Sequence, residues 1–196
     1  MSDKIEINNI SLQKIIYFID NKNISKLSTI LKKTHTADIA EIIKRIPNQK
    51  AKYLYNLITN EEISAAVLIE LEDDIREKLL ADLSPKEIAK DVIDNLETDD
   101  AADVISELPE QKKEAVLSHI ENIDLANNIS DLLEYTENTA GSLMAKELIR
   151  VNENWNIVQC IKEMRKQAEH IKTVHTIYVV DDDNKLLGLM SLRKLL

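Results

Sequence analysis

The sequence predicts a mainly α-helical protein: a right-handed superhelix, or solenoid, of short helices, followed by a smaller α/β unit. The 196 residues include only 2 glycines and 3 prolines, too few for the many turns of an all-β fold. Signals that begin helices recur at intervals of about 12 residues as far as Pro109. After residue 139 the apolar residues change from helical spacing to β-branched runs, which predicts the α/β unit.

The first part of the chain contains an internal repeat. The segment 36–49 returns as 98–111 with six of its fourteen residues identical, and such self-similarity is typical of stacked helical repeats. Residues that begin helices stand at Thr36, Pro47, Asn60, Asp73, Ser84–Pro85, Thr98 and Pro109. Further helices are expected at 11–19, 23–33, 110–121 and 124–134. Since helices of about three turns are marginal alone, they should bury their apolar stripes against one another.

The second part of the chain is predicted to have the order β-α-β-β-α. The β-branched and aromatic residues of 176–180 indicate a strand, and Asp181–Asn184 is typical of a turn. The predicted elements are strand 148–151, helix 155–169, strands 176–180 and 185–190, and a helix from residue 192. This last helix stops after about one turn, which predicts that the chain is a fragment of a longer polypeptide. Two domains are therefore expected, 1–134 and 135–196.

Acidic residues are concentrated in the middle of the chain. Residues 61–139 carry 23 acidic and 6 basic side chains, a net charge of −17, whereas the whole chain carries −10. Such a block repels phosphates and argues against a nucleic-acid partner. It is either a solvated surface that keeps the protein in solution or a face whose self-repulsion is relieved by divalent cations.

Composition and spacing disfavour several other classes of protein. The longest apolar run, 65–69, has five residues, against ~20 for a membrane-spanning helix, so the fragment itself is expected to be soluble. Its single cysteine, Cys160, fits a reducing compartment and lies on the apolar face of a predicted helix. No Ser-His-Asp or Cys-His arrangement is suggested, and the chain is not expected to be an enzyme. Four histidines are too scattered for a metal cluster: His35, His119, His170 and His175.

Two carboxylates form the candidate metal pair. Thr98 is predicted to cap a helix, which places Asp99 in the first turn and Asp103 on the same face, with their β-carbons about 5–6 Å apart. Carboxylate oxygens and retained water are the ligands that Mg²⁺ prefers. The alternative is that these acids only complement the helix dipole and need no metal. The run Asp181–Asp183 lacks the glycine and glutamate of a calcium loop, so a turn is favoured there.

Several segments resemble a known family. The strands and turn of Ile177–Asp181 and Gly188–Leu195 resemble a CBS motif, of which only the first of the usual pair is present. The stretches Asp99-Asp100-Ala-Ala-Asp103 and Tyr135-Thr-Glu-Asn-Thr-Ala-Gly-Ser-Leu-Met144 resemble the N-terminal cytosolic part of the MgtE family of magnesium transporters. The resemblance extends from about residue 35 to the end of the chain.

This resemblance implies a superhelical N domain over 1–134 and an incomplete CBS α/β unit over 135–196, truncated in its last helix. It implies a cytosolic region that senses Mg²⁺ and closes the pore when the ion is bound. The implied ligands are the carboxylates of Asp99 and Asp103 and the backbone carbonyl of Ser142. The family also implies a homodimer whose transmembrane domain belongs to the same polypeptide, at the cytoplasmic face of the cell membrane. Mg²⁺ binding should be weak here, because most other ligands of the family lie outside this chain.

ATP is a possible ligand of a CBS motif but is disfavoured here. The usual pattern ends in Gly-x-x-Ser/Thr-x-x-Asp, whereas this chain has Gly188, Ser191 and Lys194, and a lysine cannot accept a ribose hydroxyl bond. Thr176 stands where the family can carry an aromatic residue to stack adenine. Two alternatives remain open: a helical-repeat interaction scaffold with a CBS module, whose acidic face recognises a basic partner, and the regulatory part of a CBS-regulated enzyme.

Overall fold

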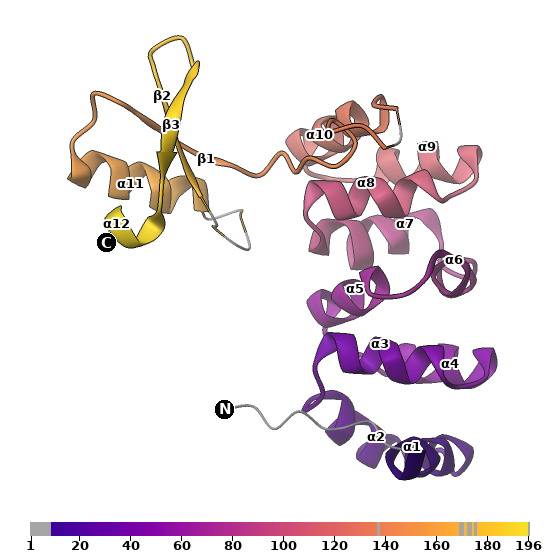
Figure 1. Cartoon of the computed structure of the whole chain (residues 1–196). Coiled ribbons are helices and arrows are strands. Elements are labelled where there is room, and N and C mark those ends of the chain that lie inside the picture. The colour runs from indigo at the N-terminus through magenta and orange to yellow at the C-terminus, as the bar shows by residue number, and fades with distance from the viewer. Residues whose placement is uncertain (1–8, 137, 169–170, 172–173, 175, 196) are drawn as a thin grey trace. The chain divides into compact units, whose positions relative to one another are not determined.

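The chain folds as two compact units. The computed structural model describes residues 9–136, 138–168, 171, 174 and 176–195. The first unit comprises residues 1–96 and 100–133, and the second comprises residues 97–99 and 134–196. Each unit is described by itself below, and their elements carry the labels of Figure 1.

The first unit is a stack of short helices that begin where the sequence predicts. Asn60 accepts a hydrogen bond from the amide of Ile63 (2.9 Å) and begins α5. Ser84 and Glu87 form a capping box at α7, in which each side chain binds the other residue's amide. The α-helices are α1 Asn9–Asp20, α2 Ile24–Leu31, α3 Thr36–Lys44, α4 Asn48–Tyr55, α5 Glu61–Ile69, α6 Asp73–Leu80, α7 Pro85–Glu87, α8 Thr98–Ser106, α9 Glu110–His119 and α10 Ile123–Leu133.

The segment after α7 departs from regular α-helix. It continues as a π-helical turn, η1 Ile88–Val92, and a 3₁₀ turn, η2 Ile93–Asn95. Ile88, Val92 and Ile93 are buried, so the irregular turns still present their apolar side chains to the core. Sequence periodicity identifies the buried residues here but not the change of helix type.

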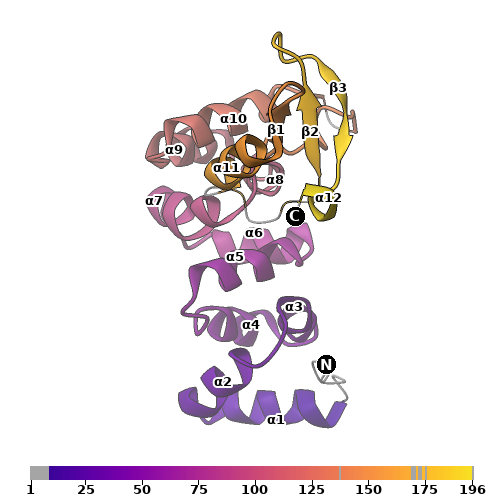
Figure 2. The ribbon, with the colours of Figure 1, turned by 90° about the vertical axis from the view of Figure 1, so that its left-hand side faces the viewer.

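Neighbouring helices of the stack pack against one another. α1 contacts α2 and α4, α3 contacts α4 and α5, and α5 contacts η1, an order that Figures 1 and 2 both show. Helices of 8 to 12 residues lack enough internal hydrogen bonds to persist alone, so this burial holds the unit together. Its largest fully buried side chains are Leu27, Ile39, Ile43, Leu54, Leu68, Leu80, Ile88, Ile93, Ile105 and Ile129.

The second unit is built on a three-stranded sheet with the predicted β-α-β-β-α order. Its elements are β1 Ile149–Asn152, α11 Ile157–Gln167, β2 Ile177–Val180, β3 Leu186–Met190 and α12 Leu192–Leu195. β1 and β2 are parallel, with Ile149 opposite Ile177, and β2 and β3 are antiparallel. The core contains Ile149, Val151, Cys160, Met164 and Ile177, which confirms the predicted place of the cysteine.

The hairpin between β2 and β3 confirms the predicted acidic turn. The Asp181 carboxylate accepts hydrogen bonds from the amides of Asp183 (3.0 Å) and Lys185 (2.8 Å). Asn184 adopts a positive φ of 60°, which asparagine tolerates better than most residues. Asp181 therefore serves the turn itself, as polar residues in tight turns commonly do.

Two sequence predictions, on membrane-spanning helices and on the histidines, can be compared with the structure only over the described residues. Within those residues, no helix is both long and apolar enough to cross a membrane. Of the four histidines, His170 and His175 lie outside the described part of the chain.

The two glycines give a matched test of packing in the second unit. A β-carbon on Gly141 would collide with the ring of Tyr135, whereas one on Gly188 would meet no atom within 4 Å. Gly141→Ala should therefore lower the free energy of unfolding by about 1 kcal/mol, the low end of the cost of overpacking, because the Tyr135 ring is 45% exposed and can shift. The fluorescence of the single tryptophan, Trp155, which lies in the same unit, reports this during urea unfolding.

Gly188→Ala is the control and should change the free energy of unfolding by less than about 0.5 kcal/mol. Combining Gly141→Ala with Tyr135→Ala should recover much of the loss. Equal losses for the two single glycine variants would contradict the packing role of Gly141.

Candidate functional site

Helix α8 carries the predicted acidic pair. Ala101, Val104 and Ile105 are fully buried on this helix, which fixes the face that it turns to the core. Asp103 is exposed and Asp99 is half-buried. Because the two residues are four positions apart on a continuous helix, their carboxylates share one side of it.

One oxygen of this pair is poorly satisfied. Asp99 Oδ1 is buried and has no hydrogen-bond partner among the described residues. Leaving a charged oxygen out of water and unpaired costs more than any neutral group would. A carboxylate oxygen in this condition suits a hard cation such as Mg²⁺, which binds through one or two carboxylates and keeps several waters.

The structure does not bring a third predicted ligand to this pair by any described contact. The Ser142 hydroxyl donates to the carbonyl of Thr139 (3.0 Å), and the Ser142 amide donates to the Thr139 hydroxyl (3.4 Å). Within the described parts of the chain, no three His, Cys, Asp or Glu side chains are grouped so as to hold a metal. The role of the Ser142 carbonyl therefore stays a prediction from the family resemblance.

The first residue of α8 is bound differently from what the sequence predicts. The Thr98 amide donates to Glu147 Oε1 (2.9 Å) and the Thr98 hydroxyl donates to Glu147 Oε2 (2.7 Å). The same hydroxyl accepts a bond from the amide of Lys146 (2.9 Å). Thr98 was expected to cap its own helix. Instead its hydroxyl binds residues nearly 50 positions downstream, and a carboxylate from there accepts one of the first-turn amides.

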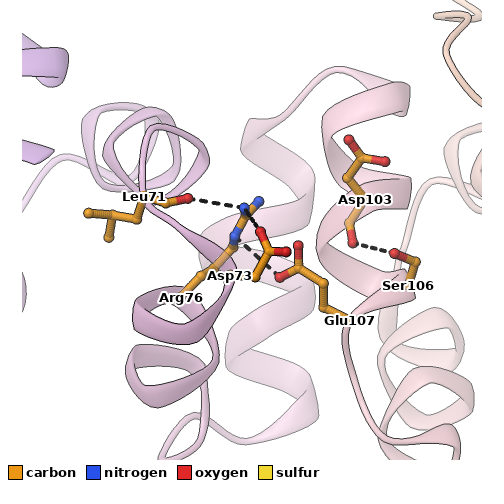
Figure 3. A network of polar contacts seen from close by, with 6 residues as sticks. All are labelled: Leu71, Asp73, Arg76, Asp103, Ser106 and Glu107. Atoms are coloured by element: carbon orange, nitrogen blue, oxygen red, sulfur yellow. Dashed lines mark hydrogen bonds and ion pairs between the residues drawn. The ribbon is translucent and has the colours of Figure 1, made fainter. Parts of the chain in front are cut away.

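The other end of α8 is held by a buried arginine, shown in Figure 3. Arg76 of α6 donates from Nη2 to the Leu71 carbonyl (3.1 Å) and to Asp73 Oδ1 (3.0 Å). Its Nε lies 3.2 Å from Glu107 Oε2, directly after α8, in an ion pair that falls short of hydrogen-bond geometry. The Arg76 side chain is 9% exposed and that of Glu107 is 23% exposed, so this contact is partly shielded from water and salt.

Burial raises the pKa of the Glu107 carboxyl above its ordinary value, and the nearby Arg76 guanidinium opposes that rise. Asp73, Asp103 and Glu77 add like charge and favour the neutral form further. Arg76 is therefore the group that favours the charged form of Glu107 in an acidic neighbourhood. Sequence reasoning missed both Arg76 and Glu147, because neither stands in a motif.

One described pocket contains only one of the positions expected to contact a nucleotide. A hollow of about 130 Å³ is lined by Thr176 and by Glu147, Leu148, Ile149, Ile171, Val174 and Tyr178. Ser191 and Lys194 are not among its described lining residues. Ligand pockets for drug-sized molecules have ~300–1,000 Å³, so the hollow is small for ATP.

A helical N domain followed by a CBS unit defines the class of protein. The family model of the MgtE intracellular N domain matches residues 34–138, and that of the CBS domain matches residues 140–196. The chain therefore belongs to the MgtE family, whose matched relatives are magnesium transporters rather than enzymes.

Three curated relatives, all magnesium transporters MgtE, show the extent of the similarity. The chain is 35% identical to the Enterococcus faecalis protein over 71 residues and to the Thermus thermophilus protein over 68 residues, or 36% and 35% of its length. It is 24% identical to the Bacillus subtilis protein over 184 residues, 93% of its length. The matches cover 16%, 15% and 40% of these relatives, so the chain spans well under two thirds of each.

Two solved structures confirm the predicted fold class. The soluble part of a magnesium transporter superposes with a TM-score of 0.73 at 25% identity, over 94% of this chain and 72% of the other. The cytosolic domain of the Mg²⁺ channel MgtE in complex with ATP superposes with a TM-score of 0.78 at 24% identity, over 95% and 74%. The second likeness concerns the fold alone.

Removing Arg76 tests the anchor at the end of α8. Arg76→Met should lower the free energy of unfolding by about 2 kcal/mol at pH 7, because it leaves Glu107 charged and poorly solvated. Without Arg76 the Glu107 pKa rises further, and the folded state then binds a proton more tightly than the unfolded state does. The loss should therefore shrink as the pH falls toward about 5, as measured by urea unfolding followed by circular dichroism.

Lys78→Met is the matched control, since Lys78 forms an exposed i,i+4 pair with Asp74 on the same helix. It should cost less than about 0.5 kcal/mol at either pH. A pH-independent loss in Arg76→Met equal to that of Lys78→Met would contradict the anchoring role.

Proposed function

We propose that this chain is the cytosolic Mg²⁺-sensing region of an MgtE-type magnesium transporter, which closes the pore when Mg²⁺ is bound. The observation that carries the proposal is the buried Asp99 Oδ1, which has no hydrogen-bond partner among the described residues and lies one turn from Asp103 in a member of this family. The net charge of −17 over 61–139 supports it, because bound cations would reduce the repulsion among these side chains.

The mechanism is linkage between ion binding and conformation. Asp99 and Asp103 repel each other when no cation is present, and a bound Mg²⁺ would neutralise that repulsion. If one arrangement of the protein presents these carboxylates to the ion better than another, Mg²⁺ shifts the population toward it by the ratio of the two affinities. The Ser142 carbonyl is the third proposed ligand. Binding is expected to be weak, because two carboxylates make only part of a site.

The remaining partners follow from the family. We propose that residues 1–134 serve as the N domain and residues 135–196 as the first CBS motif, at the cytoplasmic face of the membrane. The polypeptide would continue into its own transmembrane domain and pair with a second subunit. Exposed apolar side chains on β3 support a covering partner, since Leu186, Leu187 and Leu189 are 57%, 49% and 66% exposed. ATP is not included, because Lys194 replaces the usual acid.

Thermal unfolding with Mg²⁺ titrated against K⁺ at matched ionic strength tests this function. Mg²⁺ at ten times its Kd should stabilise the folded chain by about 1.4 kcal/mol. The double variant Asp99→Asn/Asp103→Asn should lose this Mg²⁺-specific gain, since it removes both carboxylate charges.

The control is Glu110→Gln/Glu114→Gln, which removes an acidic i,i+4 pair from α9 and should keep the response to Mg²⁺. Equal stabilisation by Mg²⁺ and K⁺ in the unmodified chain would show that cations act on the acidic region only by screening its charge. That result would favour the interaction scaffold over the sensor.

A further inference from the structure

The bonds between Thr98 and Glu147 form the Thr98–Glu147 clasp. Both Glu147 oxygens accept from Thr98, one from its amide and one from its hydroxyl, and the hydroxyl accepts in turn from the Lys146 amide. Thr98 is 1% exposed, so water competes little for these bonds. Hydrogen bonds to a charged acceptor are about twice as strong as neutral ones, which makes the clasp a strong long-range contact in the described chain.

The clasp binds the first residue of α8, at the end where a helix has backbone amides without partners. The first four amides of an α-helix lack partners within the helix, and the helix dipole favours negative charge at that end. Such a cap normally comes from the residue directly before the helix. Here it comes from Glu147, 49 residues downstream, so the first turn of α8 is completed only when the later part of the chain has folded.

Both residues of the clasp belong to the second unit. The boundary falls inside α8: residues 97–99 group with 134–196, whereas Asp100 and the rest of the helix group with the first unit. Glu147 stands two residues before Ile149, which begins β1 and pairs with Ile177 in the core of the sheet. Only residue 148 therefore separates Glu147, which binds the first turn of α8, from the strand β1.

We propose that Glu147 is a positioning residue, which holds the first turn of α8, and Asp99 with it, to the strand β1. Asp99 follows Thr98 directly, so the clasp determines where its carboxylate lies. The link to sensing rests on the proposed function: a change at Asp99 on ion binding reaches the sheet through Glu147. The hydrogen bonds of the clasp themselves involve no metal ion.

Hydrogen–deuterium exchange of the whole chain, read by mass spectrometry in EDTA, tests the clasp. Glu147→Ala should speed exchange in 97–106 roughly tenfold, the scale of one charge-assisted bond, while 36–55 stays unchanged. Thr98→Val, which removes only the hydroxyl, should have a smaller effect in the same segment. Thr98→Ser should restore protection, because it keeps the hydroxyl.

The control is Glu153→Gln, which removes an exposed carboxylate from the same unit and should leave exchange unchanged. The proposal is overturned if exchange in 97–106 stays at the unmodified level in Glu147→Ala, or if Thr98→Ser behaves like Thr98→Val. Uniformly faster exchange in every segment of both Glu147→Ala and Thr98→Val would also overturn it, since the effect would then be global.

A second arm adds MgCl₂ against KCl at equal ionic strength. In the unmodified chain, Mg²⁺ should slow exchange in 97–106 and also in 145–152. In Glu147→Ala the change in 145–152 should be lost while some protection of 97–106 remains. If the unmodified chain shows no Mg²⁺ effect, the proposed function and the relay through Glu147 both fail, whereas the metal-free arm still decides the clasp.

Discussion

Helix α8 depends on two contacts with residues far from it in sequence, one a pair of hydrogen bonds to a carboxylate and the other an ion pair. Glu147 binds its first residue, and Arg76 binds the glutamate directly after its last one. A nine-residue helix has too few internal hydrogen bonds to persist alone. Burial of Ala101, Val104 and Ile105 supplies the apolar contribution, and the two contacts determine where its ends lie. The orientation of the acidic pair follows from these constraints.

The same helix concentrates negative charge. Asp99, Asp100 and Asp103 lie on it, and the capping group is itself a carboxylate. The helix dipole offsets part of this repulsion near the first turn, and Arg76 offsets part of it at the other end. One buried oxygen of Asp99 remains without a described hydrogen-bond partner. A buried carboxylate oxygen on a helix this rich in acidic side chains favours a response to cations, which is the physical basis of the proposed sensing.

Much of the fold is predictable because its signals are local. Asn60 and Ser84 begin helices by binding amides three residues later, and Asp181 closes a turn over four residues. Such contacts leave fixed spacings that a reader can recognise. The pair Asp99 and Asp103 is found the same way, through its one-turn spacing. By contrast, Thr98 was predicted to cap its own helix, but its hydroxyl donates a hydrogen bond to Glu147, which lies outside its local sequence.

The sequence by itself determined the helical repeat, the β-α-β-β-α order, the acidic block and the family, because periodicity, turn chemistry and charge are properties of neighbouring residues. Only the tertiary structure decided that Glu147 caps α8, that Arg76 holds Glu107, and that one Asp99 oxygen is buried without a described partner. The physical reason is that these contacts join residues 31 to 49 positions apart or depend on burial. Contacts between distant residues and burial produce no periodic pattern in the sequence. They arise only once the chain has packed.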